Sequence, residues 1–258
     1  MKQTLALIML ALAAAAMALT PISIQHFLAS RQAQEVSQPV WPIPEDETDA
    51  RKARLINTLL PAIQQNNRDL LEKRARIERL QHQLQRGRDL GGRDLQWLRT
   101  LSERYRLDPP AQANADWLTA LLRRIDIIPA DLALAQGALE SGWGESRFAI
   151  EANNYFGHWC FREGCGIVPA ARPEGASHEV EKFPSVEESV RRYMHNLNSH
   201  PRYRQLRLIR ARIRSEQRRA SGTEMAAGLD GYAQTGQAYV AQVRQMILSN
   251  GFDEFESY

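Results

Sequence analysis

One glutamate in this chain stands in a context that suits acid catalysis. Glu140 follows a run of apolar residues and is itself followed by Gly142 and Gly144, with Trp143 between them. The pattern predicts a helix that ends beside Glu140, so that Leu139 and Trp143 place its carboxyl group in partly apolar surroundings. Such surroundings raise the pKa of a carboxyl group and keep it protonated near neutral pH, as a general acid must be. The alternative is a solvated glutamate at a helix C-terminus, although the negative end of the helix dipole is unfavourable for that charge.

Residues 1–30 predict export from the cytoplasm. Leu5 to Leu19 is an unbroken apolar run, and no charged residue lies between Thr4 and Ile24. A secretory signal is one interpretation, and Ala16-Met17-Ala18 would fit its cleavage site. A retained membrane anchor is the other, and the length of the uncharged stretch favours it. We therefore expect a periplasmic or envelope location, anchored in the inner membrane, and the lack of a cysteine after the run excludes a lipoprotein.

Two cysteines enclose a short loop from Cys160 to Cys165. In an exported protein, a disulfide that closes the loop is the expected pairing. A zinc site formed by both thiols with His158 and His178 is conceivable, but the spacing matches no standard ligand pattern. We expect the disulfide, and we expect no metal and no cofactor.

The composition is that of an ordinary globular protein of 258 residues, with 43% hydrophobic and 24% charged residues. A formal net charge of +3 is too small to predict nucleic-acid binding, although it suits an anionic polymer or a membrane surface. The chain divides into four expected parts. They are a signal or anchor (1–30), a proline-rich and acidic linker (31–49), a helical N-terminal segment (50–108) and a catalytic domain (109–258).

Apolar residues recur at helical spacing through most of the chain after the linker. A long helix is expected from Ala50 to Arg86, with a break or kink at Pro61, and a helix beginning near Asp116 is expected to have that residue as its N-cap. Further helices are expected at 94–105, 129–140, 185–198, 203–219 and 237–249. Between Gly157 and Phe183, glycine, proline and alternating apolar residues predict a β-hairpin or small lobe. The expected fold is mainly α (α+β).

The motifs around Glu140 resemble those of a known family. The sequences Leu139-Glu140-Ser141-Gly142-Trp143-Gly144 and Asn153-Asn154-Tyr155-Phe156-Gly157 resemble the bacterial glucosaminidases that include the peptidoglycan hydrolase domain of the flagellar rod protein. From about Ala50 to the C-terminus, the chain is similar to the Bax-type envelope proteins of bacteria. That pattern is matched by Phe156-Gly157, Trp159-Cys160, Gly164-Cys165-Gly166 and His178-Glu179-Val180.

The resemblance implies a lysozyme-like helical domain with a small β-lobe that cuts the glycan strand of peptidoglycan at N-acetylglucosamine. Glu140 matches the family's acid, which protonates the leaving glycosidic oxygen. Tyr232 matches a tyrosine that holds substrate or stabilises the transition state, with a core aromatic as the alternative. The residues expected to bind substrate are Trp143, Asn154 and Phe156.

A glycosidase normally needs a second carboxylate, about 5–10 Å from the first. The strand expected to carry it, Gly166 to Arg172, has no acidic residue at the matching position. We expect Glu179 to fill the role because it lies in the Bax-type pattern, on the same strand face as Glu181 and Phe183 if the segment alternates. The other candidates nearby are Glu163, Glu174 and Glu181.

Three functions are compatible with these patterns. The first is a peptidoglycan N-acetylglucosaminidase, and the second is a lytic transglycosylase, which needs one acid. The third is a non-catalytic envelope protein that binds glycan or a protein partner, for which the helix in 50–86 is a candidate docking element.

A dense set of arginines follows at Arg202, Arg204, Arg207, Arg210, Arg212, Arg214, Arg218 and Arg219. This basic segment indicates either attraction to anionic lipid or wall polymer, or a solvated face of the domain.

Overall fold

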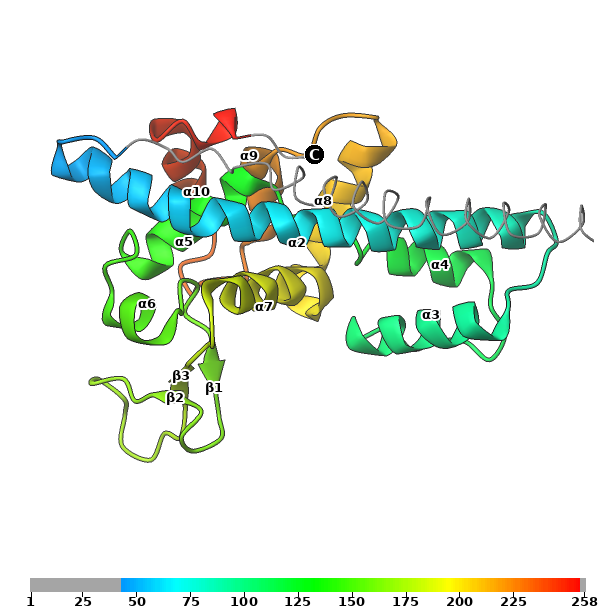
Figure 1. Ribbon diagram of the computed structural model, residues 1–258, viewed down its shortest axis with the longest axis horizontal. Coiled ribbons are helices and arrows are strands. Elements are labelled where there is room, and N and C mark those ends of the chain that lie inside the picture. Colours follow the sequence, from blue (N-terminus) through cyan, green and yellow to red (C-terminus); the bar gives the residue numbers. More distant parts are fainter. Residues whose placement is uncertain (1–42, 256–258) are drawn as a thin grey trace, which may run out of the picture. The chain divides into compact units, whose positions relative to one another are not determined.

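The computed structural model describes residues 43–255. The predicted signal or anchor and most of the linker lie outside the described residues. Within 43–255, no helix has both the length and the apolar character needed to cross a membrane. The described part is mainly helical with one small antiparallel sheet (Figure 1), which confirms the expected mainly α class.

The longest element is α2 (Glu47–Gln85), a helix of 39 residues. Asp46 begins it as an N-cap, accepting hydrogen bonds from the backbone N–H groups of Thr48 and Asp49 at 3.0 and 3.1 Å. The helix continues through Pro61, so of the expected break or kink at this residue the break is absent. Three helices of the same chain pack against it (Figure 1): α4 (Ala115–Leu122), α5 (Ala130–Ser141) and α7 (Val186–Ser199). The predicted docking helix therefore uses its buried apolar residues within its own chain.

The central element is α5 (Ala130–Ser141), which is buried around most of its circumference. It packs against α2 on one side and against α10 (Gln237–Ser249) and α9 (Gly222–Met225) on others. At its start, the buried Asp131 accepts a hydrogen bond of 2.9 Å from the backbone N–H of Gly222. Further along, a Cβ atom on Gly137 would lie 2.5 Å from a methyl group of Leu59, so a larger residue there would require the Leu59 side chain to move.

The predicted N-terminal segment shares one hydrophobic core with the rest of the described chain. From this segment, α3 (Gly92–Arg104) is joined to α4 (Ala115–Leu122) by a buried hydrogen bond of 3.0 Å from Trp117 Nε1 to Ser102 Oγ. The N-cap of α4 is Asn114, whose side chain accepts from the backbone N–H of Trp117, and not the expected Asp116.

The remaining helices are α6 (Arg147–Ala152), α7 (Val186–Ser199), η1 (Pro201–Tyr203), α8 (Arg204–Ser215), η2 (Ala226–Gly228) and η3 (Phe252–Glu254). The bounds of α10 are those predicted. The short helices α6 and α9 were not predicted, because six and four residues are too few to show a periodic pattern.

The predicted β region forms a three-stranded antiparallel sheet in the order β1-β3-β2. It consists of β1 (Trp159–Cys160), β2 (Gly166–Ile167) and β3 (Glu179–Glu181). With their connecting loops, these strands form the β-lobe (residues 157–183), which extends from the helices below α6 and α7 in Figure 1.

A buried carboxylate joins the long helix to the basic segment. Asp126 is 2% exposed and lies between α4 and α5. It accepts a 2.8 Å hydrogen bond from Nε of Arg214, and its carboxylate lies 3.2 Å from Nη1 of Arg74 and 3.8 Å from Nε of Arg210. Burial alone would raise the pKa of Asp126, but the charges of these arginines outweigh it and hold the pKa below its ordinary value.

Candidate active site

The end of α5 fixes the position of Glu140. Gly142 takes the left-handed conformation, with φ of 57°, which ends the helix at Ser141. The Ser141 hydroxyl donates to the carbonyl of Gly137 at 2.5 Å and accepts from the N–H of Gly144 at 2.7 Å. These bonds close the last turn, so Glu140 projects from a rigid helix end and not from a mobile loop.

A chain of hydrogen bonds leads from the core to the Glu140 carboxyl group. Tyr193 of α7 donates to Oε1 of Gln136 at 2.7 Å, and Nε2 of Gln136 donates to the hydroxyl of Tyr239 at 2.9 Å. Tyr239 in turn donates to Oε1 of Glu140 at 2.7 Å. Because the Tyr239 oxygen already accepts from Gln136, its own proton is directed at Glu140.

This direction indicates which oxygen of Glu140 carries a transferable proton. Oε1 accepts from Tyr239, so the proton of the neutral acid belongs on Oε2. That oxygen lies next to Gly157, where a Cβ atom would be only 3.9 Å away. A Cβ atom at that distance would be in ordinary van der Waals contact, so it is the left-handed backbone of this residue, with φ of 66°, that favours glycine here.

The surroundings of Glu140 favour its neutral form. The residue as a whole is exposed, but burial of its carboxyl group raises the pKa above the ordinary value, and the hydrogen bond from Tyr239 only partly opposes this. Since a general acid must be protonated, activity that depends on Glu140 should fall as the pH rises through this raised pKa.

Tyrosines surround the acid. Tyr232 stacks on Tyr239 with 5.2 Å between ring centroids, and its hydroxyl donates to the carbonyl of Phe156 at 3.3 Å. Tyr203 lies 5.9 Å from Tyr232, also between ring centroids. Burial raises the pKa of Tyr232 well above its ordinary value, and the charges of Tyr239 and Glu140 add to this. The structure thus brings the two predicted residues Glu140 and Tyr232 into one cluster.

Two of the residues predicted to bind substrate are buried beside this cluster. Phe156 is 3% exposed and stacks on Tyr193 with a centroid distance of 4.0 Å. Asn154, which is 2% exposed, donates to the carbonyls of His158 and Glu181 and accepts from the N–H of His158. Both hold the chain between α6 and β1 in place. Contact with substrate stays a prediction for them, and for the half-buried Trp143.

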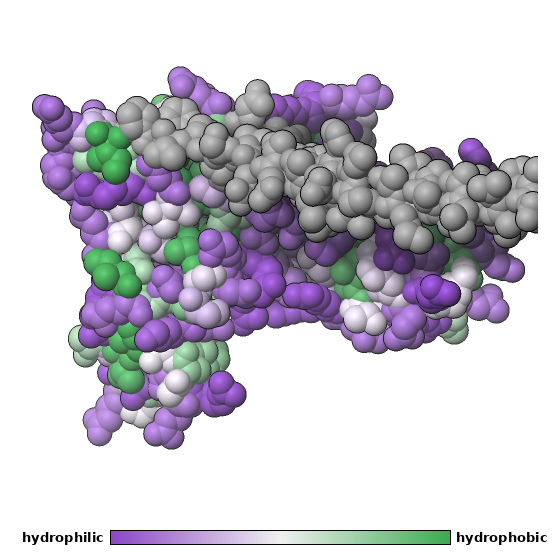
Figure 2. Space-filling view, in the orientation of Figure 1, coloured by the Kyte–Doolittle hydropathy of each residue, from purple (hydrophilic) through white to green (hydrophobic). Residues whose placement is uncertain are grey.

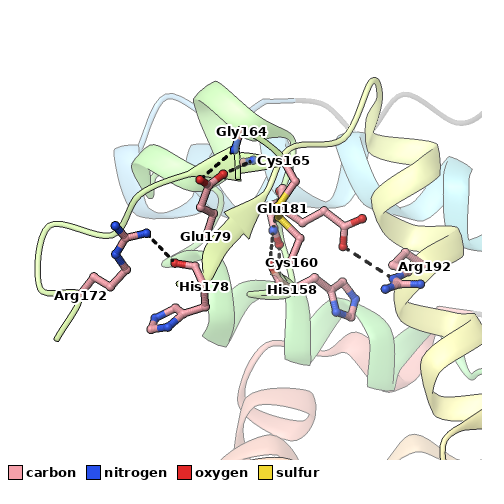
Figure 3. Close-up of a disulfide and its surroundings, with 11 residues drawn as sticks. His158, Cys160, Gly164, Cys165, Arg172, His178, Glu179, Glu181 and Arg192 are labelled. Carbon is pink, nitrogen blue, oxygen red and sulfur yellow. Dashed lines mark hydrogen bonds and ion pairs between the residues drawn. A yellow bond between two sulfur atoms is a disulfide. The ribbon is translucent and has the colours of Figure 1, made fainter. Parts of the chain in front are cut away.

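The predicted disulfide between Cys160 and Cys165 is present (Figure 3), so neither sulfur is a free thiol ligand. The carboxylate of Glu179 holds the loop that the disulfide closes. It accepts from the backbone N–H of Gly164 at 3.0 Å and from that of Gly166 at 2.7 Å (Figure 3). These hydrogen bonds hold the pKa of Glu179 below its ordinary value, although the side chain is only 5% exposed.

These contacts give Glu179 a structural task, and its part as second carboxylate stays a prediction. Glu181 of the same strand lies 3.7 Å from Nε of Arg192 as an ion pair. Glu163 and Glu174 are exposed in the loops of the β-lobe.

Hydrophobic residues gather on the surface of the β-lobe (Figure 2). Trp159, Phe161 and Val168 are 55%, 71% and 47% exposed. The Trp159 ring stacks on His178 with a centroid distance of 4.3 Å. Exposed apolar surface of this kind is typical of a binding face.

The sequence interpretation missed the two residues that hold the acid, Gln136 and Tyr239. Gln136 could have been found, because it lies one helical turn before Glu140 on the same face. Nothing local in the sequence marks Tyr239, which is 99 residues away from Glu140.

Replacing Tyr239 with phenylalanine should lower kcat about tenfold. The change removes the donor to Oε1, which frees the Glu140 side chain to rotate. It also removes the hydrogen bond that lowers the pKa of Glu140, so the alkaline limb of the pH–rate profile should move to higher pH. Tyr105→Phe, which removes a hydroxyl from a buried ring outside this cluster, is the control. An unchanged alkaline limb in Tyr239→Phe would contradict the proposed influence of Tyr239 on the acid.

Comparisons with known proteins extend these observations. Residues 115–252 match the family model Glucosaminidase, described as mannosyl-glycoprotein endo-beta-N-acetylglucosaminidase. The matched range contains Glu140, Tyr232, Tyr239 and the whole β-lobe. Protein bax of Escherichia coli (strain K12) is 32% identical over 200 residues, which cover 78% of this chain and 70% of that protein. No solved structure gives a significant match.

Proposed function

Because this chain belongs to the glucosaminidase family and is a Bax-type member of it, we propose that it hydrolyses the glycan strand of peptidoglycan at N-acetylglucosamine. The observation that carries this proposal is the acid at the end of α5. Glu140 has a raised pKa, and the hydrogen bond from Tyr239 to Oε1 fixes its orientation and leaves Oε2 to carry the proton.

In the proposed reaction, Glu140 donates its Oε2 proton to the glycosidic oxygen as the bond from that oxygen to the anomeric carbon breaks. A water molecule then supplies the hydroxyl group that the anomeric carbon gains, and its remaining proton returns to Glu140 or to a second carboxylate. Tyr232 stands beside the acid and is proposed to hold the sugar. The exposed Trp159 ring is a surface on which a neighbouring sugar could stack.

A lytic transglycosylase is the second candidate. It is favoured by the contacts of Glu179, whose two carboxylate oxygens are both engaged by backbone N–H groups. A transglycosylase needs only one acid, because a hydroxyl group of the substrate takes the place of water and closes an anhydro ring.

Digestion of purified peptidoglycan by the full-length protein tests the proposal, with products identified by mass spectrometry. We expect fragments that have gained one water and carry a new reducing end at N-acetylglucosamine. Anhydro products, lighter by one water, would instead establish the transglycosylase. If no fragments form while the protein still binds the polymer, the chain is a binding protein.

Replacing Glu179 with glutamine should lower turnover at least about tenfold, equivalent to roughly 1.4 kcal/mol. The side-chain NH2 group of glutamine would face the backbone N–H of Gly164 or Gly166, so two donors would meet and one hydrogen bond would be lost. Glu163→Gln removes an exposed carboxylate from the same lobe and is the control. The melting temperature should fall in either case, because the amide disturbs the loop. If Glu179 is the second carboxylate, the acid limb of the pH–rate profile should also be lost; if it acts only through the loop, turnover should fall while the shape of the profile is unchanged. Full activity in Glu179→Gln and in the same change at Glu163, Glu174 and Glu181 would favour a one-acid mechanism.

The same family membership implies a glycan substrate and a location outside the cytoplasm, and we propose the periplasm. Attachment to the inner membrane rests on residues 1–30, outside the described part of the chain, and stays a sequence-based prediction.

A further inference from the structure

The structure divides the arginines of the basic segment into two groups. One group has carboxylate partners within ion-pair distance and comprises Arg210, Arg212, Arg214 and Arg218. The other group has no carboxylate of residues 43–255 within 4.0 Å of its guanidinium groups and comprises Arg202, Arg204, Arg207 and Arg219. Of these, Arg204 and Arg207 lie on the first turn of α8. The glycosidase proposal gives these two arginines no task.

Arg204 and Arg207 line a hollow of about 210 Å³ between the start of α8 and the end of α4. Arg123 and Arg124 line it from the α4 side, and Leu107 and Leu208 are among its apolar residues. No acidic side chain is part of this lining. The hollow therefore presents several guanidinium groups without a negative charge among them.

Of the four arginines that line the hollow, Arg207 gives the strongest evidence for a bound anion, because its charged side chain is in a residue that is only 5% exposed. Its Nη1 donates to the carbonyls of Leu197 and His200 at 2.8 and 2.9 Å, which satisfies part of the group but leaves its charge unbalanced. Burial lowers the pKa of Arg207 to about 10, and repulsion from Arg124, Arg210 and Arg204 contributes. Buried charges in proteins are normally paired with an opposite charge. No carboxylate of residues 43–255 pairs with the Arg207 guanidinium, so we expect its counter-ion to come from a ligand.

A neighbouring hollow of about 360 Å³ shares Arg123 and Arg207 but differs in its charge. It contains Asp126, whose single carboxylate is shared by Arg74, Arg210 and Arg214. Of these two hollows, only the first has no carboxylate in its lining.

We propose that the hollow between α4 and α8 binds a phosphate group. A guanidinium group matches the oxygens of a phosphate with paired N–H donors, and the free donors of Arg207 and of the exposed Arg123 and Arg204 surround the same space. A bound phosphate would replace the repulsion among these arginines with attraction. None of these residues belongs to the hydrogen-bond chain of Glu140, so the site is independent of the proposed glycosidase activity.

Calorimetric titration of the full-length protein with inorganic phosphate tests the proposal. We expect saturable binding that weakens at least about tenfold in the double variant Arg123→Gln/Arg204→Gln, because charge-assisted hydrogen bonds are lost. Both side chains are exposed, so the fold should be retained, which the melting temperature would check. The matched control is Arg86→Gln/Arg88→Gln, which removes the same charge from another exposed basic surface and should bind phosphate like the unmodified protein.

Vesicles identify the source of the phosphate. Binding should be measured to phosphatidylglycerol vesicles and to phosphatidylcholine vesicles, and the difference between the two taken. Any attachment through the N-terminal apolar stretch contributes to both measurements and is removed by the subtraction. If the double variant reduces this difference and the control does not, a lipid headgroup supplies the phosphate. If only titration with inorganic phosphate responds, the ligand is a soluble phosphate.

The proposal is overturned if the unmodified protein does not bind phosphate. It is equally overturned if the double variant binds phosphate as tightly as the control. Activity on peptidoglycan should be the same in both double variants.

Discussion

Replacing Glu140 with glutamine should lower the rate of glycan cleavage by about 100- to 10,000-fold, the usual contribution of a general acid. Glutamine has the same shape and can still accept the hydrogen bond from Tyr239, but it has no proton to give to the leaving oxygen. The rate should be measured as the release of soluble fragments from purified peptidoglycan. The melting temperature should stay close to that of the unmodified protein, because the residue is exposed at the end of α5.

The control is Glu145→Gln, which neutralises a nearby exposed glutamate that pairs with Arg51 at 3.3 Å. This variant should keep full activity. If Glu140→Gln is as active as Glu145→Gln, then Glu140 is not the acid and the proposed mechanism is wrong.

Replacing Asp126 with asparagine should lower the free energy of unfolding by about 3–5 kcal/mol, the cost of breaking a buried ion pair by removing one partner. The change leaves Arg74, Arg210 and Arg214 without their shared counter-ion, and the first two are largely buried. Urea denaturation followed by circular dichroism would measure the loss.

Asp94→Asn is the matched control because Asp94 also forms an ion pair, at 2.7 Å with Arg76, but on the surface. Pairs of that kind contribute about 0–1 kcal/mol. Equal losses in the two variants would show that the Asp126 cluster adds no more to stability than a surface pair.

The same cluster should make stability depend on pH. The pKa of Asp126 is lower in the folded protein than its ordinary value of 3.8. The unfolded chain therefore takes up a proton at a higher pH than the folded chain does. The stabilisation from Asp126 is fully present above that ordinary value and is lost as the pH falls through the folded pKa. In Asp126→Asn, the free energy of unfolding should not show this loss as the pH falls, because asparagine does not titrate.

The sequence predicted those parts of the molecule that depend on local patterns. The glycines after Glu140 indicate where α5 ends, and the apolar spacing of residues 237–249 predicts α10. The short spacing of Cys160 and Cys165, together with the expected export of the protein, predicted their disulfide. In each case, neighbours in the sequence determine the local structure.

Features that depend on packing could not be predicted in this way. Tyr239 meets Glu140 only because α10 packs on α5. The alternation of residues in β3 predicts which face of the strand Glu179 lies on. It does not predict that a nearby loop donates two backbone N–H groups to its carboxylate. That α2 continues through Pro61 could likewise not be predicted, because a proline inside a helix normally breaks or kinks it.

The number of residues in α5 matters as much as their identity. The helix is held at its start by the bond between Asp131 and Gly222 and at its end by the turn at Ser141 and Gly142. One inserted residue would turn Glu140 by about 100° and move it by about 1.5 Å along the axis. If the bond between Asp131 and Gly222 keeps its place, that rotation turns the carboxyl group away from Tyr239. Insertions and deletions in this helix should therefore reduce activity far more than most substitutions do, because the number of residues between Asp131 and Glu140 sets the position of the carboxyl group.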